Sequence, residues 1–367
     1  SFSSTFQPTS HPASLVSTFR PMPHPTPPFP TPRKSKPPVA GLVLDLFLER
    51  RPNETWIAEL LMPQLVMWNR WWVTARQYSP TTGAKNASAG GGLLAPGSTR
   101  ANNQLAISCS DQDPVTASRC ETGLDNSPLY DGAHFVADED VIDSVDVGMT
   151  ALYARDCRSL ARVCRRLGPA YEAYAVELEG RATATVSTLN REGWNDNAGV
   201  YGNKLWGSGA WYPLVRGTLV IGPPNLYPML AGAPTDEQVE RMLRRYVTNA
   251  SEFAVEPGTG FGIPSISRSS SAFSDNNYWR GRAWGPMNML VFLGLREYAH
   301  LPLATRAMAD LARQSEATFL VEWVPNHRVM ENFNSVNGKG CDVSNAIPFY
   351  HWGALNALVS LMEAGLM

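Results

Sequence analysis

Two acidic residues lie in polar, turn-rich stretches where a side chain could take part in chemistry. Asp125 belongs to residues 121–128 (ETGLDNSP), and Glu331 follows 206 residues later in residues 329–338 (VMENFNSVNG). Gly, Asn, Ser and Pro disfavour helices and place neighbouring side chains on loops. A pair of carboxylates can act as general acid and general base, which is the pair that hydrolysis of a glycosidic bond requires.

Each acid also has a purely structural interpretation. Asp125 and Asn126 could form an ordinary Asx turn before Pro128. A Glu in a polar loop is usually a solvated surface residue, and His327 beside Glu331 could be plain surface polarity. Neither His327 nor His351 has the spacing of a metal ligand, so the sequence predicts no metal site, and the proposed chemistry needs no cofactor.

A third candidate stretch is residues 278–286 (YWRGRAWGP). Tyr278, Trp279 and Arg280 combine aromatic faces with a guanidinium, and Gly281 lets the backbone approach closely. This combination suits the floor and wall of a pocket for a polar ring. The alternative is a helix N-terminus with core Trp residues, and both interpretations can hold together.

Composition excludes several classes of protein. Of 367 residues, 44% are hydrophobic and only 17% are charged, with a net charge of −2, so neither a nucleic-acid surface nor a polybasic membrane patch is indicated. No apolar run approaches the roughly 18 residues of a membrane span. The five Cys show no metal spacing. Cys109 and Cys120 flank a polar loop and could pair, whereas Cys157 and Cys164 lie two helical turns apart.

The apolar periodicity predicts helix after helix and no βαβ unit. Residues 1–36 are rich in Pro and Ser and are expected to be disordered or extended, ahead of one domain over residues 37–367. Helices are predicted at 39–48, 54–76 with a kink or boundary at Pro63, 145–167, 169–190, 235–247, 286–298, 301–322 and 349–363. Long loops at 78–134, 194–233 and 256–285 suit an all-α toroid of paired helices. A helical-repeat solenoid is the rival, but no fixed sequence period is visible.

Four stretches in order resemble the catalytic domain of glycoside hydrolase family 63. The first is residues 68–72 (WNRWW) with Arg76 and the glycine run at 90–93, and the second is residues 121–128. The third is residues 278–288, and the fourth is residues 331–340 followed by 348–355 (PFYHWGAL). The resemblance covers residues 37–367.

The resemblance implies an (α/α)6 barrel and an inverting α-glycosidase without a cofactor. By position in the motifs, Asp125 is the expected general acid and Glu331 the expected general base. Tyr278, Trp279 and Arg280 are expected in the sugar pocket, and Trp72, Asn126 and Trp352 are the other expected substrate-binding residues. Asp131 is a nearby carboxylate that could raise the pKa of the acid.

The sequence departs from the family pattern in two places. The Trp-Asp pair of an earlier barrel helix is not found, so the barrel is expected to be incomplete at its N-terminus. Asn203 stands where the family often has Asp. The predicted function is hydrolysis of a terminal α-linked glucosyl or mannosyl residue of an oligosaccharide or glycosylglycerate, and the alternative is an inactive carbohydrate-binding protein. Compartment and oligomeric state are left open.

Overall fold

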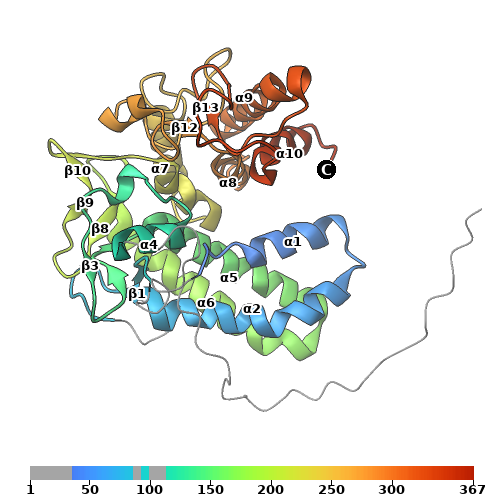
Figure 1. The fold of residues 1–367 in the computed structure, drawn as a ribbon. Helices are drawn as coiled ribbons and strands as arrows, with labels where there is room; N and C mark the ends of the chain where they lie inside the picture. Colours follow the sequence, from blue (N-terminus) through green and yellow to red (C-terminus); the bar gives the residue numbers. More distant parts are fainter. Residues whose placement is uncertain (1–34, 86–91, 99–112) are drawn as a thin grey trace, which may run out of the picture. The chain divides into compact units, whose positions relative to one another are not determined.

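The computed structural model describes residues 35–85, 92–98 and 113–367. Contacts divide the chain into residues 1–33 and 34–367, and the description below concerns the second unit alone. Figure 1 shows that this unit is built mainly of helices. The α-helices of the described part are α1 (Ala40–Arg50), α2 (Thr55–Arg76), α4 (Pro114–Thr122), α5 (Val147–Leu167), α6 (Glu172–Thr188), α7 (Asp236–Met242), α8 (Gly285–Arg296), α9 (Pro302–Asn326) and α10 (Ala354–Glu363).

Helix ends follow the capping signals in the sequence. Thr235 and Gln238 form a capping box at the start of α7. At the start of α5, the Asp146 side chain accepts a hydrogen bond from the Met149 N–H at 2.7 Å. Helix α5 ends at Gly168, where the sequence predicts a stop.

Helix α1 has no local cap and depends on a residue far along the chain. Its N-cap position, Val39, offers no side-chain acceptor. Instead the fully buried Asp156 of α5 accepts the Gly41 N–H at 2.6 Å and a second hydrogen bond from the Leu42 N–H. The Asn69 side chain of α2 also donates to Asp156, at 3.2 Å. One carboxylate therefore joins three helices.

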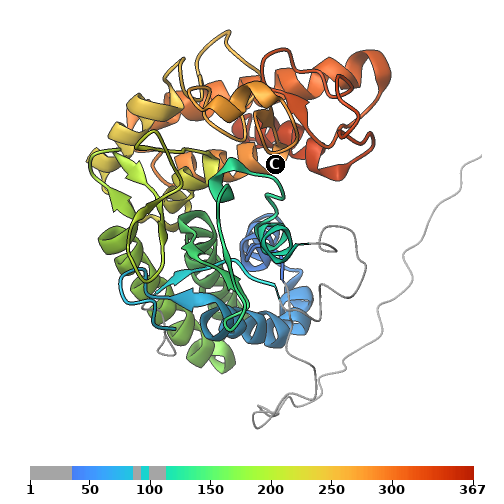
Figure 2. The same cartoon turned by 60° about the vertical axis from the view of Figure 1, so that its left-hand side comes forward.

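The helices pack as a succession of neighbours with others behind them. Helix α5 packs against α1 and against the 3₁₀ helix η4 (Pro223–Ala231), η4 packs against α8, and α8 packs against α10. Helix α6 lies against α5, and α9 lies against α8 and α10. Figure 2 shows this curved succession from the blue helices through green and yellow to red. This is the predicted (α/α)6 toroid class of fold.

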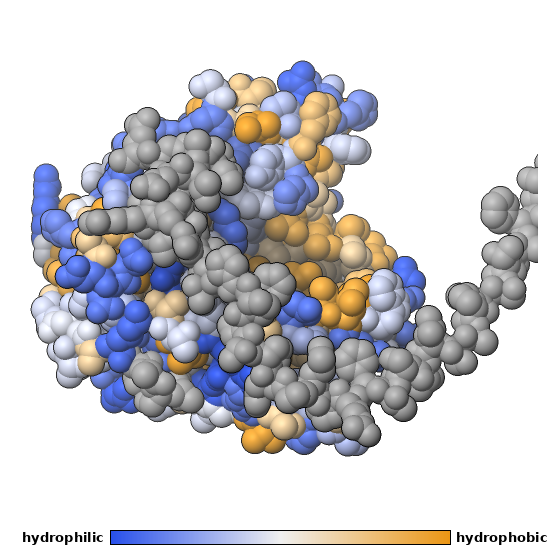
Figure 3. Space-filling view, turned by 60° about the horizontal axis from the view of Figure 1, so that its bottom comes forward, coloured by the Kyte–Doolittle hydropathy of each residue, from blue (hydrophilic) through white to orange (hydrophobic). Residues whose placement is uncertain are grey.

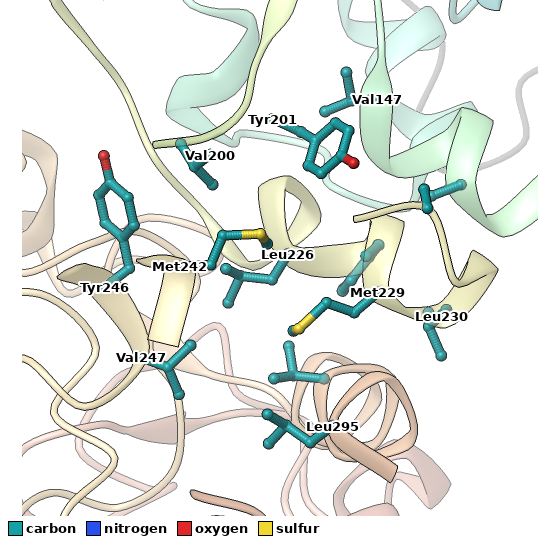
Figure 4. Close-up of a cluster of buried hydrophobic side chains, with 14 of the residues drawn as sticks. Val147, Val200, Tyr201, Leu226, Met229, Leu230, Met242, Tyr246, Val247 and Leu295 are labelled. Carbon is teal, nitrogen blue, oxygen red and sulfur yellow. The ribbon is translucent and has the colours of Figure 1, made fainter. Parts of the chain in front are cut away.

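The largest buried cluster joins the middle of this succession. Residues of α5, η4, α7 and α8 contribute to it, together with the strand Val200–Tyr201 and the π-helical segment Leu243–Val247. Aliphatic, Met and Tyr side chains pack around η4 (Figure 4). The labelled members are Val147, Val200, Tyr201, Leu226, Met229, Leu230, Met242, Tyr246, Val247 and Leu295. Because η4 contacts both α5 and α8, it connects the N-terminal and C-terminal helices through one core.

Short antiparallel strand pairs, which the apolar periodicity of the sequence does not predict, connect the helices. Sheets pair β1 with β2, β3 with β4, β6 with β7, β10 with β11 and β12 with β13, and a three-stranded sheet has the order β5-β8-β9. The strands are β1 (Gln77–Tyr78), β2 (Leu93–Leu94), β3 (Phe135–Val136), β4 (Val141–Ile142), β5 (Ser144–Val145), β6 (Trp194–Asn195), β7 (Val200–Tyr201), β8 (Asn203–Leu205), β9 (Trp211–Tyr212), β10 (Leu214–Val215), β11 (Thr218–Leu219), β12 (Arg282–Ala283) and β13 (Phe333–Asn334).

Two predictions about local structure are wrong, and a third is wrong in one of its alternatives. Helix α4 lies inside the segment 78–134 that was predicted to be loop, because its nine residues carry no apolar stripe long enough to detect. Pro63 is not a helix boundary, because α2 continues past it, whereas the alternative of a kink at Pro63 stays a prediction. The last predicted helix begins at Ala354, after a 3₁₀ turn at His351–Gly353, and not at residue 349.

A space-filling view shows hydrophobic side chains gathered in a hollow on one face (Figure 3). None of the helices in the described ranges has the length and apolar character needed to cross a membrane. Cys157, Cys164 and Cys341 are free thiols, and Cys120 is disulfide-bonded. Cys109, the partner considered for Cys120, lies outside the described residues.

Candidate active site

Asp125 lies in a tight turn between α4 and a short 3₁₀ helix. Helix α4 ends at Thr122, and Gly123 follows in the left-handed conformation at φ 76°, which Gly adopts without strain. The Ser127 side chain then caps Pro128–Tyr130 by accepting the Leu129 N–H. The half-buried Asp125 is held between these two ends. Glu121, the first residue of the motif, is helical and not part of the turn.

Tyr278 and Trp279 form the tip of a two-residue hairpin. Asn277 and Arg280 exchange backbone hydrogen bonds of 3.1 and 3.0 Å. Tyr278 has φ 56°, an uncommon value for a bulky residue. The Asn126 side chain accepts the Trp279 N–H at 2.9 Å and donates to the Asn277 carbonyl at 3.3 Å. The residue after the candidate acid therefore fastens the acid loop to this hairpin.

Glu331 lies between α9 and α10 and is only 4% exposed. Its backbone N–H donates to the Ile347 carbonyl at 2.9 Å, and the Ile347 N–H donates to Glu331 Oε2 at 3.4 Å. Two residues further on, β13 pairs with β12, so Phe333 lies opposite Ala283. The Tyr278 hydroxyl donates to Glu331 Oε1 at 3.0 Å. The hairpin and the Glu331 loop are thus joined through backbone and side chains.

The two candidate carboxylates affect the pKa values of the same neighbouring groups. Burial raises the pKa of Glu331, and the nearby Asp125 charge acts in the same direction. The hydrogen bonds from Tyr278 and Ile347 oppose that rise in the pKa of Glu331. The pKa values of Tyr278 and Tyr350 are also raised, first by burial and then by Glu331 and Asp125. Two acids far apart in sequence therefore act on the same pair of phenols.

An aromatic cluster lies beside these carboxylates. The indoles of Trp279 and Trp284 stack with ring centroids 3.6 Å apart and an interplanar angle of 8°. Trp352 meets both of them, at 6.3 and 5.8 Å between centroids. Tyr278 packs edge-on against Trp284 at 4.9 Å. The cluster fixes the hairpin against the start of α8 and of α10.

Arg280 forms salt bridges with two carboxylates. Its Nη1 lies 2.8 Å from Asp131 Oδ2, and its Nε lies 2.7 Å from Asp275 Oδ2. Asp131 also lies 3.7 Å from the Arg119 guanidinium. Asp131, considered above as the group that raises the pKa of Asp125, is therefore matched with cations. The charge of Asp125 acts on Glu331, whose pKa it raises.

A buried guanidinium organises the loops from behind. Arg282 is completely buried, and its Nε donates to the Asn332 side chain beside Glu331. Its Nη1 pairs with Asp342 at 2.9 Å, and its Nη2 donates to the Lys339 and Gly340 carbonyls. This one side chain connects the hairpin to both arms of the loop that carries Glu331.

Residues 21–352 match the model of the mannosylglycerate hydrolase MGH1-like glycoside hydrolase domain. The chain belongs to this glycoside hydrolase family. The resemblance to glycoside hydrolase family 63 drawn from the four sequence motifs is thereby confirmed. The match contains every candidate residue of the site.

Among curated proteins, the mannosylglycerate hydrolases MGH1 and MGH2 of Selaginella moellendorffii are each 24% identical to this chain over 351 residues. The alignments cover 83% of this chain and 62% of each relative, so the chain spans less than two thirds of their length.

Solved structures with a similar fold include two hydrolases. The family 63 mannosylglycerate hydrolase from Thermus thermophilus in complex with glucose matches with a TM-score of 0.62 and 21% identity, covering 89% of this chain and 75% of that one. The neutral trehalase Nth1 from Saccharomyces cerevisiae matches with a TM-score of 0.59 and 15% identity, covering 91% and 62%. At these identities the likeness describes the fold, in agreement with the predicted toroid.

One predicted site residue, Trp72, lies in a core cluster, and its role in substrate binding stays a prediction. Trp72 is completely buried in a cluster formed with α1, α5 and α6, and its ring contacts are Trp68 and Trp71. The other predicted residues, Asp125, Asn126, Tyr278, Trp279, Arg280, Glu331 and Trp352, are brought together.

Sequence reasoning missed two members of the site. Tyr350 follows the positive-φ residue Phe349, and its pKa responds to both candidate carboxylates. Arg282 lies inside the hairpin motif (residues 278–286), but the residues next to it in the sequence do not indicate that its side chain is buried. Asn203, noted as a departure from the family, accepts the Val147 N–H at 3.0 Å and so supports the start of α5. No His, Cys, Asp and Glu side chains of the described ranges cluster as a metal site would.

Proposed function

We propose that this protein is an inverting α-glycoside hydrolase in which Asp125 is the general acid and Glu331 the general base. The observation that carries the proposal is geometric. The Asn126 side chain fastens the loop of Asp125 to the 277–280 hairpin, and the Tyr278 hydroxyl of that hairpin donates to Glu331 Oε1 at 3.0 Å. The Asp125 charge also raises the pKa of Glu331. Two carboxyl groups flanking the scissile bond are the shared requirement of this class of reaction.

The reaction would proceed in one displacement. Asp125 gives its proton to the leaving oxygen as the bond from that oxygen to the anomeric carbon breaks. A water on the opposite face forms the new bond to carbon and passes a proton to Glu331. Exchange with solvent then returns a proton to Asp125 and removes one from Glu331. Inverting enzymes hold the two carboxyl groups about 6.5–9.5 Å apart to leave room for this water.

For the substrate we propose an α-linked glucosyl or mannosyl residue carried by a small acid such as glycerate. The support is membership of a family named for mannosylglycerate hydrolase and the two Selaginella relatives with that name. Stacked indoles beside the carboxylates suit the apolar face of a hexose. An N-glycan-type α-glucoside is the finer alternative for the same sugar subsite.

The test is a product-configuration assay by NMR on α-mannosylglycerate, α-glucosylglycerate and α-linked oligosaccharides. We expect the β-anomer to appear first, and Glu331→Gln and Asp125→Asn to lose at least about 100-fold in kcat. Matched controls are Glu59→Gln and Asp138→Asn, which remove exposed carboxylates. First release of the α-anomer, or full turnover by Glu331→Gln, would overturn the proposal. Binding by calorimetry without product would instead identify the carbohydrate-binding alternative.

A further inference from the structure

Tyr278 is held more firmly than a side chain that only contacts substrate needs to be. Its backbone is fixed at positive φ in the hairpin tip, and the Trp284 indole N–H donates to its carbonyl at 3.0 Å. The Asn345 side chain holds Asn277 of the same turn at 2.6 Å. A strained backbone persists only where its surroundings over-determine it, and such sites are often functional.

This arrangement fixes the direction of the hydrogen bond that the Tyr278 hydroxyl donates. The Tyr278 hydroxyl donates to Glu331 Oε1 at 3.0 Å, while Glu331 Oε2 receives the Ile347 N–H at 3.4 Å. Each oxygen of the carboxylate thus has one donor from the protein. Because a carboxylate has about four acceptor positions, others are left for a water molecule.

We propose that Tyr278 is a positioning residue that sets the orientation of the Glu331 carboxylate toward the attacking water, and that it is not a sugar contact. This rests on the proposed role of Glu331 as general base, and it revises the substrate-binding role predicted for Tyr278 from the sequence. The phenol donates one proton to one oxygen, so Glu331 can rotate only by breaking that bond.

The same bond stabilises the ionised form that a base must have. Tyr278 and Asp125 act on the pKa of Glu331, and Glu331 in turn raises the pKa of Tyr350. Burial and the Asp125 charge raise the pKa of Glu331, and the Tyr278 hydrogen bond lowers it. Loss of the hydroxyl therefore raises the pKa of Glu331, and the base becomes active only at higher pH.

The test is Tyr278→Phe, which removes one oxygen and keeps the ring against Trp279 and Trp284. We expect kcat to fall roughly ten- to a hundredfold while KM stays near the wild-type value. The acidic limb of the kcat/KM profile should move upward by about one pH unit. Tyr174→Phe is the matched control. It removes a phenol from α6, outside the candidate site, so the acidic limb should stay in place.

A second readout needs no substrate. With ¹³C-labelled Glu carboxyls, the Glu331 resonance is assigned by its loss in Glu331→Gln and titrated in wild type and Tyr278→Phe. A higher pKa of Glu331 in Tyr278→Phe supports the inference, and an unchanged pKa overturns it. A rise in KM with unchanged kcat and acidic limb would also overturn it, since that is the result for a sugar contact. If Glu331→Gln itself retains turnover, it is the proposed function that fails.

Discussion

The buried Asp156 leads to a prediction about stability that runs against the usual behaviour of carboxylates. Burial raises the pKa of Asp156 from 3.8 to about 6, although hydrogen bonds from Gly41, Asn69 and Leu42 act the other way. The folded protein therefore binds a proton more tightly than the unfolded chain does. The stabilisation from this group is complete below pH 3.8 and is lost as the pH rises through 6.

The shift of about two pKa units corresponds to about 3 kcal/mol of unfolding free energy over the whole range. Asp156→Asn has a similar shape and no titration, so the contribution disappears. Relative to wild type, the variant should gain about 2.5 kcal/mol in unfolding free energy between pH 4 and pH 7. The amide also faces the Asn69 amide differently, but that offset is the same at every pH.

The assay is urea unfolding followed by Trp fluorescence at half-unit steps from pH 4 to pH 7, for wild type and Asp156→Asn. The exposed variant Asp138→Asn provides the baseline. Only the pH-dependent part of the difference between the two curves is interpreted, since other groups titrate equally in both. A difference that does not change with pH would show that the carboxyl at 156 has the same pKa in the folded and unfolded chains.

Three further outcomes are expected. Asp125→Ala should keep most of the wild-type turnover of a glycosyl fluoride, because fluoride leaves without a proton, but it should lose the turnover of alkyl glycosides. Equal losses of turnover on both substrates in steady-state kinetics would argue against the role of Asp125 as the acid. Arg282→Met leaves the Asp342 carboxylate without its buried cation and should lower the unfolding free energy by about 3 kcal/mol. An unchanged urea midpoint would show that this ion pair does not contribute to stability. Gly285→Ala, ordinarily stabilising in a helix, should destabilise by about 1–3 kcal/mol because its Cβ would meet the Trp352 carbonyl oxygen; a raised melting temperature would refute this.

Helices with an unbroken apolar stripe were predictable, and their irregular neighbours were not. Helix α5 has the periodicity and the Gly168 stop that identify it in sequence. By contrast, η4 takes its place between α5 and α8 although Pro223, Pro224 and Pro228 argue against a helix. A 3₁₀ segment packed on both sides is stabilised by tertiary contacts, which no local pattern reveals.

The site was predictable only where a motif carried it. Asp125 and Glu331 are each ordinary in their own surroundings, and only the family motifs suggested that they face one site. Trp72 is wholly buried, and because an indole in a motif can belong to the core as well as to a pocket, its predicted role in the pocket stays a prediction. Arg282 could not be assigned because burial of a guanidinium depends on acceptors such as Asp342 from another loop.

The Asn126 amide has a consequence for how this site can change over evolutionary time. It ties the loop of the candidate acid to the hairpin, and the hairpin is tied in turn to the loop of the candidate base. The spacing of the two carboxylates is therefore set by three loops gripping one another, with little demand on the identity of the surrounding helices. Such a centre can keep its geometry while most of the scaffold changes, and the curated relatives are 24% identical to this chain over 351 aligned residues.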